Sequence, residues 1–474
     1  MSTQQLRVHT TTFTYEATTE AYAFFYHFVK EYGEDQAFLL DSVTRDEIPY
    51  TSSMIGLFPI LSVHGKGEKL MVQGERSVLE QLELPRQDTI EGNLSYQLDQ
   101  IMAKFIVDDH LPHYAFGYLG FFGYDAIRYF EAIPATTYDD REIDDFHLQI
   151  HRMMMHFSPE KIVLYVHSFD HNEQIDHEHI EQLMQKSHEG IPYFSGYQSE
   201  DLQIVEDVSF EEYVSRIEKT KAYIRAGDIF QCVISKRDRI KGTIDPLAVY
   251  GRLRGMNPSP YMFYANYGQY MLFGASPEMQ VRMEDGIVQM KPIAGTSKGK
   301  GKTKEENEKL ISALVADEKE RAEHVMLVDL CRNDIGRIAQ AGTVKVEQLL
   351  QIEEYSHVYH LVSLVKGNVR EKVSSFDVFL STFPAGTLSG APKVRAMEII
   401  DEIEDVHRGP YGGVIGMIDC YGNLDTAIII RTVVVKDGVS YLQAGAGIVA
   451  DSDPEQEWRE CNHKLGALRA TLFA

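Results

Sequence analysis

The sequence has few cysteines and no long apolar run. Its four cysteines include no Cys-x-x-Cys pair, so neither a zinc knuckle nor a disulfide framework is indicated, and we expect reduced thiols. No apolar stretch approaches the roughly 18 residues that a membrane-spanning helix requires. The first residues also lack the basic-then-apolar layout of a signal peptide. The sequence therefore predicts a cytoplasmic protein with no membrane partner.

A run of lysine and arginine is also missing. The chain carries 46 basic against 71 acidic residues, a formal net charge of −25. Such a field repels polyanions, so we expect no nucleic-acid partner. A small anionic substrate remains compatible with this charge if the site holds a divalent cation.

The length and composition are those of a folded, enzyme-sized protein. The 474 residues suggest two to three domains, and 44% are hydrophobic and 25% charged, which argues against disorder. Residues 1–168 mix strand and helix patterns. Residues 169–206 are rich in His, Glu, Asp and Gln, and we interpret them as a connecting segment. Residues 207–474 then form the second predicted domain.

Local patterns predict an α+β fold. The stretch FEEYVSRIEKTKAYIRAG predicts a long helix that ends at Gly227, followed by a β-branched strand, FQCVISKRDRI. Glu284-Asp285-Gly286 between two strand patterns indicates a tight hairpin. Because strands joined by tight hairpins are antiparallel, we expect antiparallel sheets with helices packed outside.

Two pairs of glutamates are spaced for chemistry: Glu320 with Glu323, and Glu457 with Glu460. Residues three apart share one face of a helix, so each pair offers two oxygen ligands. Four such oxygens suit a hard divalent ion such as Mg²⁺. A solvated helix face explains a single Glu-x-x-Glu equally well, so neither pair is evidence alone.

Glycine is concentrated in three runs, FPAGTLSGAPK, RGPYGGVIG and QAGAGIVADSDPE. Glycines let backbone amides approach an anionic oxygen, so Gly445, Ala446 and Gly447 are candidates to cradle a carboxylate. The alternative is tight turns between antiparallel strands. None of the runs matches a phosphate-binding loop.

Two further side chains are candidates. Arg431 stands near the end of TAIIIRT, which we interpret as one apolar strand buried on both faces. An unpaired guanidinium would be unfavourable there, so Arg431 should meet a carboxylate of the protein or of a ligand. His360 closes the stretch YSHVYH, and a histidine of the core or surface is an equal alternative there.

Together these residues resemble a known family. From Ile224 to Leu468 the chain resembles the chorismate-binding domain of chorismate-utilising enzymes, specifically the large subunits of anthranilate synthases. The first 168 residues, with LLDS and GYLGFFGYDAIRYFE, resemble the first domain of that family. The resemblance rests on nine motifs in family order: AGDIFQCVIS, NPSPYMFY, GASPEM, PIAGT, ERAEHVMLVDLCRND, FPAGTLSGAPK, GPYGG, AIIIRT and QAGAGIVADSDPE.

The resemblance implies antiparallel sheets sandwiched with outer helices and a Mg²⁺-dependent conversion of chorismate and ammonia into anthranilate and pyruvate. It assigns the metal to Glu323 and Glu460, with Glu320 and Glu457 assisting through water. The ion would bind the ring carboxylate of chorismate. The positions implied to contact the substrate are Gly295, Thr296, Tyr411, Arg431, Gly445, Ala446 and Gly447.

The resemblance also implies catalytic residues. Glu278 matches the position of the proton donor to the leaving hydroxyl, and a buried carboxyl tends to stay protonated, as an acid requires. His360 and Thr387 match positions implicated in the elimination of pyruvate. Their detailed roles stay open.

Two positions distinguish the chemistries of the family. Relatives that add water carry a lysine base where this chain has Gln231, which cannot take a proton from water. Relatives that make 4-amino-4-deoxychorismate carry a nucleophilic lysine where this chain has Ala294. Addition of ammonia at the adjacent ring carbon is the chemistry that remains.

The family's tryptophan feedback site is resembled by Leu40, Ser42, Pro260, Tyr261 and Met262. The family usually has Leu-Leu-Glu-Ser where this chain has Leu-Leu-Asp-Ser, so the resemblance implies tryptophan inhibition with its strength in doubt. An apolar strand that ends in a solvated Asp-Ser turn is the alternative.

No segment offers a nucleophilic cysteine elbow followed by His and Glu, so ammonia should come from a separate glutamine amidotransferase subunit. Two other functions remain open. One is synthesis of 2-amino-2-deoxyisochorismate for a secondary pathway, without pyruvate release. The other is a non-catalytic chorismate or tryptophan binder, against which the intact glutamate pairs argue.

Overall fold

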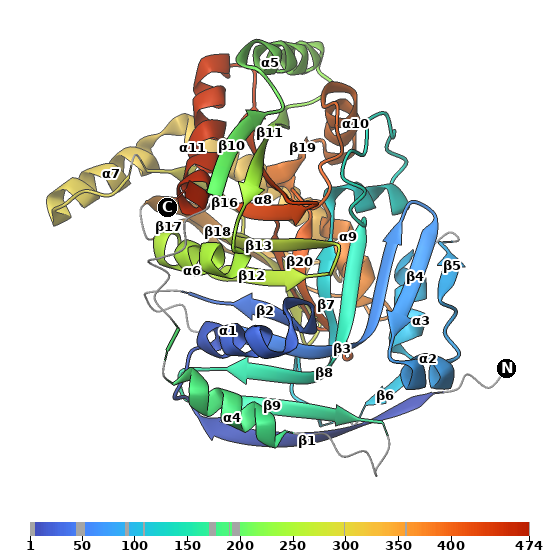
Figure 1. The fold of residues 1–474 in the computed structure, drawn as a ribbon. Helices are drawn as coiled ribbons and strands as arrows, with labels where there is room; N and C mark the ends of the chain where they lie inside the picture. Colours follow the sequence, from blue (N-terminus) through green and yellow to red (C-terminus); the bar gives the residue numbers. More distant parts are fainter. Residues whose placement is uncertain are drawn as a thin grey trace.

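A computed structural model describes residues 5–43, 53–90, 94–107, 110–169, 177–188, 190–191, 200–297, 299–355 and 358–473. The chain folds into two antiparallel sheets that pack face to face, with helices on the outside (Figure 1). This is the α+β sandwich that the sequence predicts. None of the helices in these ranges is both long and apolar enough to cross a membrane.

The first sheet joins strands from the amino-terminal part of the chain to strands from its second half. Strand β2 pairs with β12, so the segment around Leu40 lies beside the segment around Met262. The strand order is β1 (Leu6–Glu16), β9 (Lys161–Ser168), β8 (Phe146–Phe157), β3 (Ser53–Lys66), β2 (Ala37–Asp41), β12 (Tyr261–Asn266), β13 (Tyr270–Ser276), β22 (Thr432–Lys436), β23 (Val439–Ile448), β11 (Gln231–Thr243) and β10 (Glu200–Glu206).

The second sheet continues from the same two long strands, β3 and β8. Phe58, at φ 55°, and a shift in register between Pro59 and Leu61 bend this pair, so its two halves serve different sheets. The order is β5 (Gln87–Thr89), β4 (Lys69–Gly74), β3, β8, β7 (Gly117–Phe122), β20 (Val414–Asp419), β21 (Leu424–Ile428), β14 (Met279–Glu284), β15 (Ile287–Met290) and β18 (Tyr359–Asn368), which also pairs with β16 (Ile293–Thr296) and β17 (Lys345–Glu354).

The core has three layers. Apolar side chains of β2, β7, β12, β13, β20 and β22 fill the space between the sheets. Helices α1 (Ala21–Tyr32), α4 (Glu178–Ser187), α6 (Pro246–Met256) and α11 (Pro454–Phe473) cover one outer face. The other face is covered by α2 (Arg76–Leu82), α3 (Leu94–Met102), α5 (Phe210–Ala226), α8 (Glu318–Gly336), α9 (Ser375–Thr382) and α10 (Lys393–Ile403).

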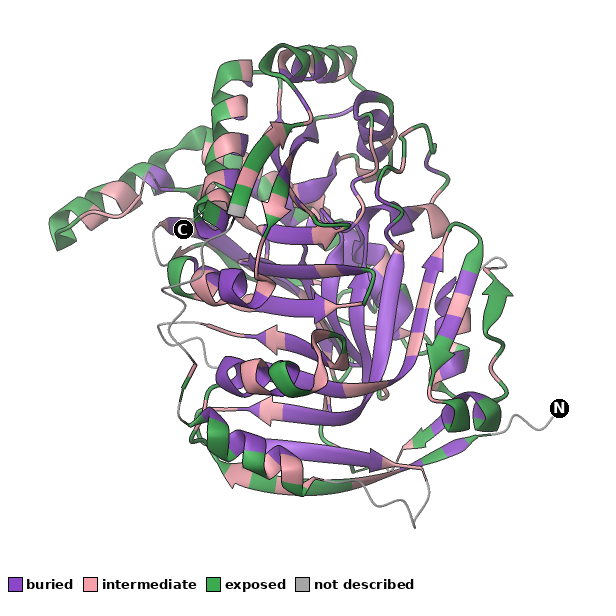
Figure 2. Cartoon of the chain, in the orientation of Figure 1, coloured by how far each residue is buried: buried purple, intermediate pink, exposed green. Residues whose placement is uncertain are grey.

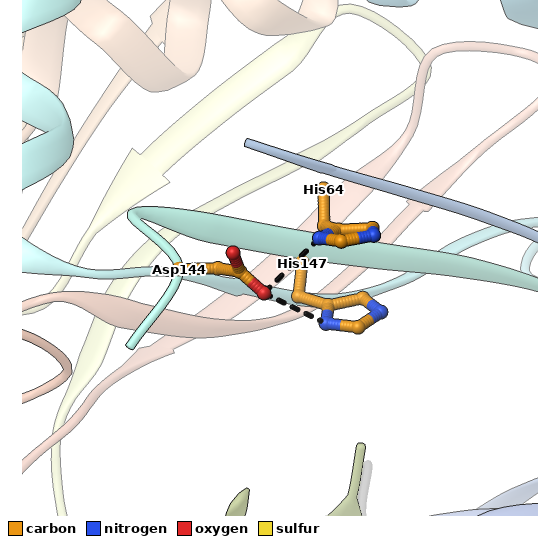
Figure 3. A group of neighbouring side chains, drawn as sticks. All are labelled: His64, Asp144 and His147. Carbon is orange, nitrogen blue, oxygen red and sulfur yellow. Dashed lines mark hydrogen bonds and ion pairs between the residues drawn. The ribbon is translucent and has the colours of Figure 1, made fainter. Parts of the chain in front are cut away.

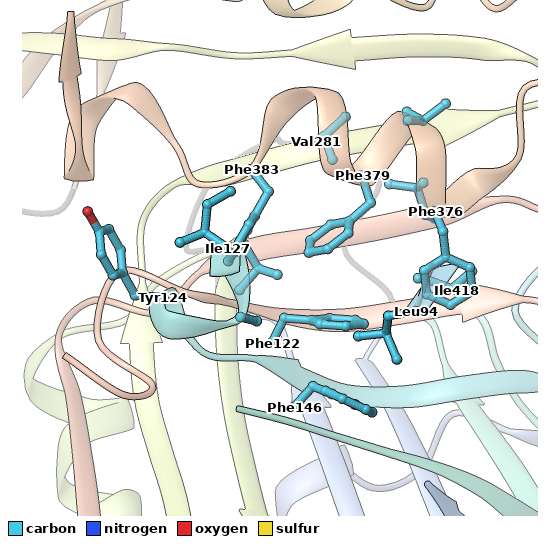
Figure 4. Close-up of a cluster of buried hydrophobic side chains, with 14 of the residues drawn as sticks. Leu94, Phe122, Tyr124, Ile127, Phe146, Val281, Phe376, Phe379, Phe383 and Ile418 are labelled. Atoms are coloured by element: carbon cyan, nitrogen blue, oxygen red, sulfur yellow. The ribbon is translucent and has the colours of Figure 1, made fainter. Parts of the chain in front are cut away.

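Aromatic rings dominate the contact between α9 and the second sheet (Figure 4). The ring centroids of Phe122 and Phe379 lie 4.7 Å apart, and those of Phe379 and Phe383 lie 5.0 Å apart. This packing fixes the segment that follows α9, which carries Thr387. Figure 2 shows the buried strands inside and the exposed helix faces outside, with α7 (Lys304–Ala316) extending away from the body.

Several local predictions are confirmed. Helix α5 ends at Ala226 because Gly227 takes a left-handed conformation, φ 86°. Strands β14 and β15 pair directly on either side of the turn at Asp285 and Gly286. The division into residues 1–168, 169–206 and 207–474 stays a prediction. The connecting segment contains α4 and β10, while its residues 170–176, 189 and 192–199 lie outside the described ranges.

Candidate active site

Both glutamate pairs lie on helices, as their spacing predicts. Glu320 and Glu323 are in the first turns of α8, and Glu457 and Glu460 are in the first turns of α11. The side chain of Asp317 caps α8 by accepting hydrogen bonds from the backbone N–H groups of Lys319 and Glu320. The cap fixes where α8 begins, and with it the direction of its first carboxylates.

The charges of these carboxylates act on one another. Burial raises the pKa of Glu323, and the negative charges of Glu320, Glu460 and Glu457 raise it further, while Lys319 opposes the rise. The pKa values of Glu320 and Glu457 are also raised, in each case first by burial. These acids from two helices repel one another, and a bound cation would neutralise this repulsion.

The four carboxylates do not form a closed cage. Among the described residues, three side chains of ligand type bring their ligand atoms within 4.8 Å of one another only at His64, Asp144 and His147. No three of the glutamate side chains therefore converge directly on one point. This spacing suits Mg²⁺, which often keeps several waters and takes one or two carboxylates directly.

Gln231 lies against the glutamates. It begins β11, it is 4% exposed, and its Nε2 donates a hydrogen bond to Oε1 of Glu323 at 3.1 Å. The side chain passes over Gly447, where an added Cβ would lie 2.3 Å from Nε2. Only glycine therefore leaves room for the amide to reach Glu323. Within the described ranges, the amide oxygen Oε1 of Gln231 is buried without a hydrogen-bond partner.

Gly445, Ala446 and Gly447 lie inside strand β23, so the alternative of a tight turn is wrong for this run. They pair with Ser235, Ile234 and Val233 of β11. A Cβ at Gly445 would come within 2.9 Å of the hydroxyl of Tyr411. The strand thus presents bare backbone toward Tyr411, on the face that also carries Gln231.

Gly295 and Thr296 end β16 beside β18. Oγ1 of Thr296 lies 3.0 Å from Nδ1 of His360, which also lies 3.2 Å from the carbonyl oxygen of Gly295. The backbone N–H of Thr296 donates to Glu320. Burial lowers the pKa of His360. Nδ1 is therefore engaged with its own site neighbours, and the ring is neutral near pH 7.

Glu278 is the buried acid of the site, 9% exposed. Its Oε1 accepts a hydrogen bond from the hydroxyl of Thr387 at 3.1 Å. Burial raises the pKa of Glu278 to about 7, although the Thr387 bond and the positive charges of Lys464 and Arg431 lower it. The cause of the raised pKa is desolvation rather than neighbouring acids. A cavity of about 20 Å³ beside Glu278 and Thr387 has room for one water.

Arg431 is not part of a continuous apolar strand, which corrects the prediction. Strand β21 ends at Ile428 and β22 begins at Thr432, and Arg431 lies between them at φ 50°. A left-handed conformation is unfavourable for arginine, so the surrounding structure imposes it. Burial lowers the pKa of its guanidinium, while the charge of Glu278 and the nearby Tyr355 raise it. The break turns the side chain toward the site.

Two residues of the site were missed by the sequence analysis. Lys464 donates from Nζ to the carbonyl oxygen of Gly445 at 2.9 Å and lies 2.7 Å from Oε1 of Glu460. Its spacing of four residues from Glu460 was the available signal. The ring of Tyr355 stands edge-on to His360, with centroids 4.8 Å apart. No local sequence pattern indicates that contact.

The residues assigned to tryptophan gather at the pairing of β2 with β12, where Asp41 lies opposite Met262. Asp41 is buried, and its carboxylate accepts from Arg254 Nε at 2.6 Å and from Ser53 Oγ at 2.8 Å. The Asp-Ser pair is therefore not a solvated turn. The hydroxyl of Ser42 is buried without a partner in the described part of the chain. Leu40, Pro260 and Tyr261 flank this pairing.

Known proteins show the same organisation. The chain is 44% identical over 448 residues to anthranilate synthase component 1 of Acetivibrio thermocellus, covering 91% of this chain and 89% of that protein. It is 39% identical to anthranilate synthase component 1 of Pseudomonas aeruginosa, covering 92% of this chain and 90% of that protein.

Solved structures agree. Anthranilate synthase component I from Streptococcus pneumoniae superposes with a TM-score of 0.77 at 33% identity, covering 90% of this chain and 94% of the other. The menaquinone-specific isochorismate synthase of Escherichia coli shares the fold, with a TM-score of 0.71 at 18% identity, covering 99% of this chain and 95% of the other. Residues 61–470 match the family described as chorismate binding enzyme. The chain belongs to the chorismate binding enzyme family.

Proposed function

We propose that this protein is the large subunit of an anthranilate synthase, which converts chorismate and ammonia into anthranilate and pyruvate with Mg²⁺. Its similarity to proteins named anthranilate synthase component 1 supports the proposal. The observation that carries it is Glu278, a buried carboxyl whose pKa of about 7 lets it hold a proton at neutral pH. Loss of the ring hydroxyl needs such a proton donor.

The donor set fits Mg²⁺. All four candidate side chains are carboxylates, and Glu320, Glu323 and Glu457 have pKa values raised by burial and by like charges. Glu323 and Glu460 would hold the ion directly, and Glu320 and Glu457 through water. When bound, Mg²⁺ would neutralise the ring carboxylate of chorismate.

The other charged end of chorismate is the carboxylate on its enolpyruvyl side chain. Arg431 is available to bind it, because its guanidinium lies near the site and the pKa of about 7 leaves the neighbouring Glu278 partly protonated at neutral pH. The backbone of Gly445, Ala446 and Gly447 and the hydroxyl of Tyr411 would complete this cradle. Gly295 and Thr296 would face the ring.

Glu278 would donate its proton to the leaving hydroxyl of the ring, and Thr387 holds the carboxyl in place for this step. His360 is neutral and can accept a proton during the elimination of pyruvate. The amide of Gln231 donates a hydrogen bond to Glu323 and is not a base, so it cannot activate water. Ala294 has no nucleophilic group. Free ammonia is then the nucleophile that adds.

Two partners follow from this proposal. A glutamine amidotransferase subunit would supply the ammonia, so the chain alone should use ammonium salts and not glutamine. L-tryptophan would bind at Leu40, Ser42, Pro260, Tyr261 and Met262 and inhibit the enzyme. Asp41, already engaged by Arg254, leaves the strength of this inhibition to be measured.

Synthesis of 2-amino-2-deoxyisochorismate is the second candidate, since it would use the same glutamates, Gln231 and Ala294. The test mixes the purified chain with chorismate, ammonium and Mg²⁺ and follows anthranilate fluorescence. Anthranilate that disappears with EDTA and returns with excess Mg²⁺ supports the proposal. Chorismate consumed without anthranilate supports the second candidate, and no consumption supports a non-catalytic binder.

A further inference from the structure

The inner face of the bent strand pair β3–β8 carries polar side chains near one end of the sandwich. Ser62 and His64 are two residues apart on β3, so their side chains lie on the same face, and His147 lies opposite His64 on β8. Asp144, just before β8, points at both rings (Figure 3). Oδ2 of Asp144 is 3.1 Å from Nδ1 of His64 and 3.6 Å from Nδ1 of His147.

We propose that His64, Asp144 and His147 form a binding site for a divalent transition-metal ion of the zinc class, which joins β3 to β8 inside the sandwich. Within the described residues this is the one place where three ligand-type side chains converge to within 4.8 Å. Ligands about 2.0–2.1 Å from a tetrahedral Zn²⁺ stand roughly 3.3 Å apart, and the two distances to Asp144 bracket that value. Two imidazoles and one carboxylate favour Zn²⁺ or Co²⁺ over Mg²⁺.

His147 is held in place for this role. Its Nε2 lies 2.5 Å from Oγ of Ser62. Its Nδ1 lies 2.9 Å from the hydroxyl of Tyr270, a contact that an ion bound at Nδ1 would replace. The Ser62 hydroxyl can donate to Nε2 or accept from it, so it serves either tautomer of the ring. When Nδ1 gives its lone pair to an ion, Nε2–H donates to Ser62. Such a partner behind a ligating histidine is the usual arrangement in metal sites.

The carboxylate is also oriented. The hydroxyl of Tyr270 donates to Oδ2 of Asp144 at 2.9 Å. The neighbouring imidazoles of His147 and His64 keep the pKa of Asp144 below its usual range against the effect of burial, while burial lowers the pKa of His147 to about 4. At neutral pH the carboxylate is therefore charged and His147 is neutral, which are the forms that bind metals.

His64 is the ligand that must move. The rings of His64 and His147 stack with centroids 4.7 Å apart and planes at 18°, so their Nδ1 lone pairs do not yet converge. The ring of His147 also packs against the ring of Tyr267, with centroids 4.2 Å apart, so Tyr267 restricts its movement. Among the residues that the structure describes, His64 is bonded through Nδ1 alone, and its Nε2 is buried without a partner. A rotation of His64 out of the stack brings its nitrogen to the shared ion.

The test uses the full chain without a histidine tag, in excess Mg²⁺ so that the glutamates are occupied. Equilibrium dialysis against Co²⁺ should give one ion per chain with the visible absorption of a tetrahedral nitrogen-ligated site, and Zn²⁺ should displace it. Zn²⁺ should also raise the melting temperature. If the wild-type chain binds no stoichiometric Co²⁺, the proposal is overturned, and the three residues form only a hydrogen-bonded network. The results of the variants would not change that conclusion.

Variants locate the ion. His64→Gln and Asp144→Asn should each weaken Co²⁺ binding by at least about tenfold. His113→Gln is the matched control, because His113 pairs with Asp285 at 3.3 Å at the surface and offers no third ligand. Glu323→Gln should leave the Co²⁺ spectrum unchanged. A spectrum lost in Glu323→Gln but kept in His64→Gln overturns the proposal, since the ion then sits at the glutamates.

Discussion

Nε2 of Gln231 donates to Oε1 of Glu323 across 3.1 Å, which joins the first residue of β11 to the first turns of α8. The carboxylate accepts, so the amide must turn its Nε2 toward it and its Oε1 away. The side chain that replaces the lysine of water-adding relatives is thereby fixed against a proposed metal ligand.

Gln231→Lys tests that contact. An ammonium group beside Glu323 would pair with the carboxylate and compete with Mg²⁺. We expect ammonia-dependent anthranilate formation to fall by about tenfold or more, with a higher Mg²⁺ concentration at half-maximal rate. The measurement is initial rate against Mg²⁺. An unchanged Mg²⁺ dependence would contradict the placement of the ion at Glu323.

Glu278→Gln tests the proton donor. The amide cannot protonate the leaving hydroxyl, so we expect kcat to fall by roughly 10²–10⁴-fold with little change in chorismate binding. In the wild type, kcat/KM for chorismate should decrease as pH rises through about 7, at constant free ammonia, because the carboxyl loses its proton there. Thr387→Val removes a bond that lowers this pKa, so the decrease should move to higher pH. A profile that does not respond to Thr387→Val argues against Glu278 as the acid.

The same carboxyl predicts a pH-dependent stability. Its pKa is raised from 4.5 to about 7 in the folded protein. A group with a raised folded pKa contributes stability at low pH, and that contribution is lost as pH rises through about 7. The shift corresponds to about 3 kcal/mol at most. Thermal unfolding should therefore show Glu278→Gln to be more stable than the wild type at pH 8, with the difference shrinking or reversing near pH 5.

Glu323→Gln separates metal binding from folding. Removing one of several mutually repelling acids should leave the melting temperature without Mg²⁺ unchanged or higher at pH 8, because burial and like charges raise the pKa of Glu323. The rise in melting temperature on adding Mg²⁺ should be lost, together with activity. Glu455→Gln is the control, since Glu455 lies on α11 at the surface and pairs with Arg459 at 2.5 Å. A Mg²⁺ response that survives in Glu323→Gln would place the ion elsewhere.

Ser42→Ala tests the proposed tryptophan site. The Ser42 hydroxyl is buried with no partner in the described structure, so it is available to a ligand. We expect unchanged activity without tryptophan and a half-inhibitory tryptophan concentration higher by about tenfold, the loss of a hydrogen bond to a charged group. Inhibition curves for both proteins are the measurement. Equal curves would mean that tryptophan does not use Ser42.

Local features were predictable from the sequence, and long-range ones were not. Gly227 ends α5 and Asp285-Gly286 turns a hairpin because each acts through its own backbone. The glutamate pairs were placed on helices by spacing alone. The sharing of β3 and β8 between two sheets depends on a bend at Phe58 and on partners far along the chain. The hydrophobic periodicity of the sequence indicates neither the bend nor the pairing partners.

Arg431 shows where the sequence pattern misleads. The run TAIIIRT has the composition of one buried strand, and its hydrophobicity does not reveal a left-handed residue at position 431. Strand β22 begins only at Thr432, where it pairs with Gly274 of β13. The contacts of Tyr355 with His360 and of Lys464 with Gly445 likewise arise from tertiary packing. Motif order indicated the candidate residues, and the structure shows the contacts among them.

The stoichiometry of pyruvate to chorismate tests the central claim most directly. The purified chain is given chorismate, Mg²⁺ and ammonium near pH 7, and chorismate, anthranilate and pyruvate are measured in the same samples, with and without EDTA. The account predicts one anthranilate and one pyruvate for each chorismate consumed, and no consumption with EDTA. Chorismate consumed without pyruvate, or turnover that survives chelation, would contradict it.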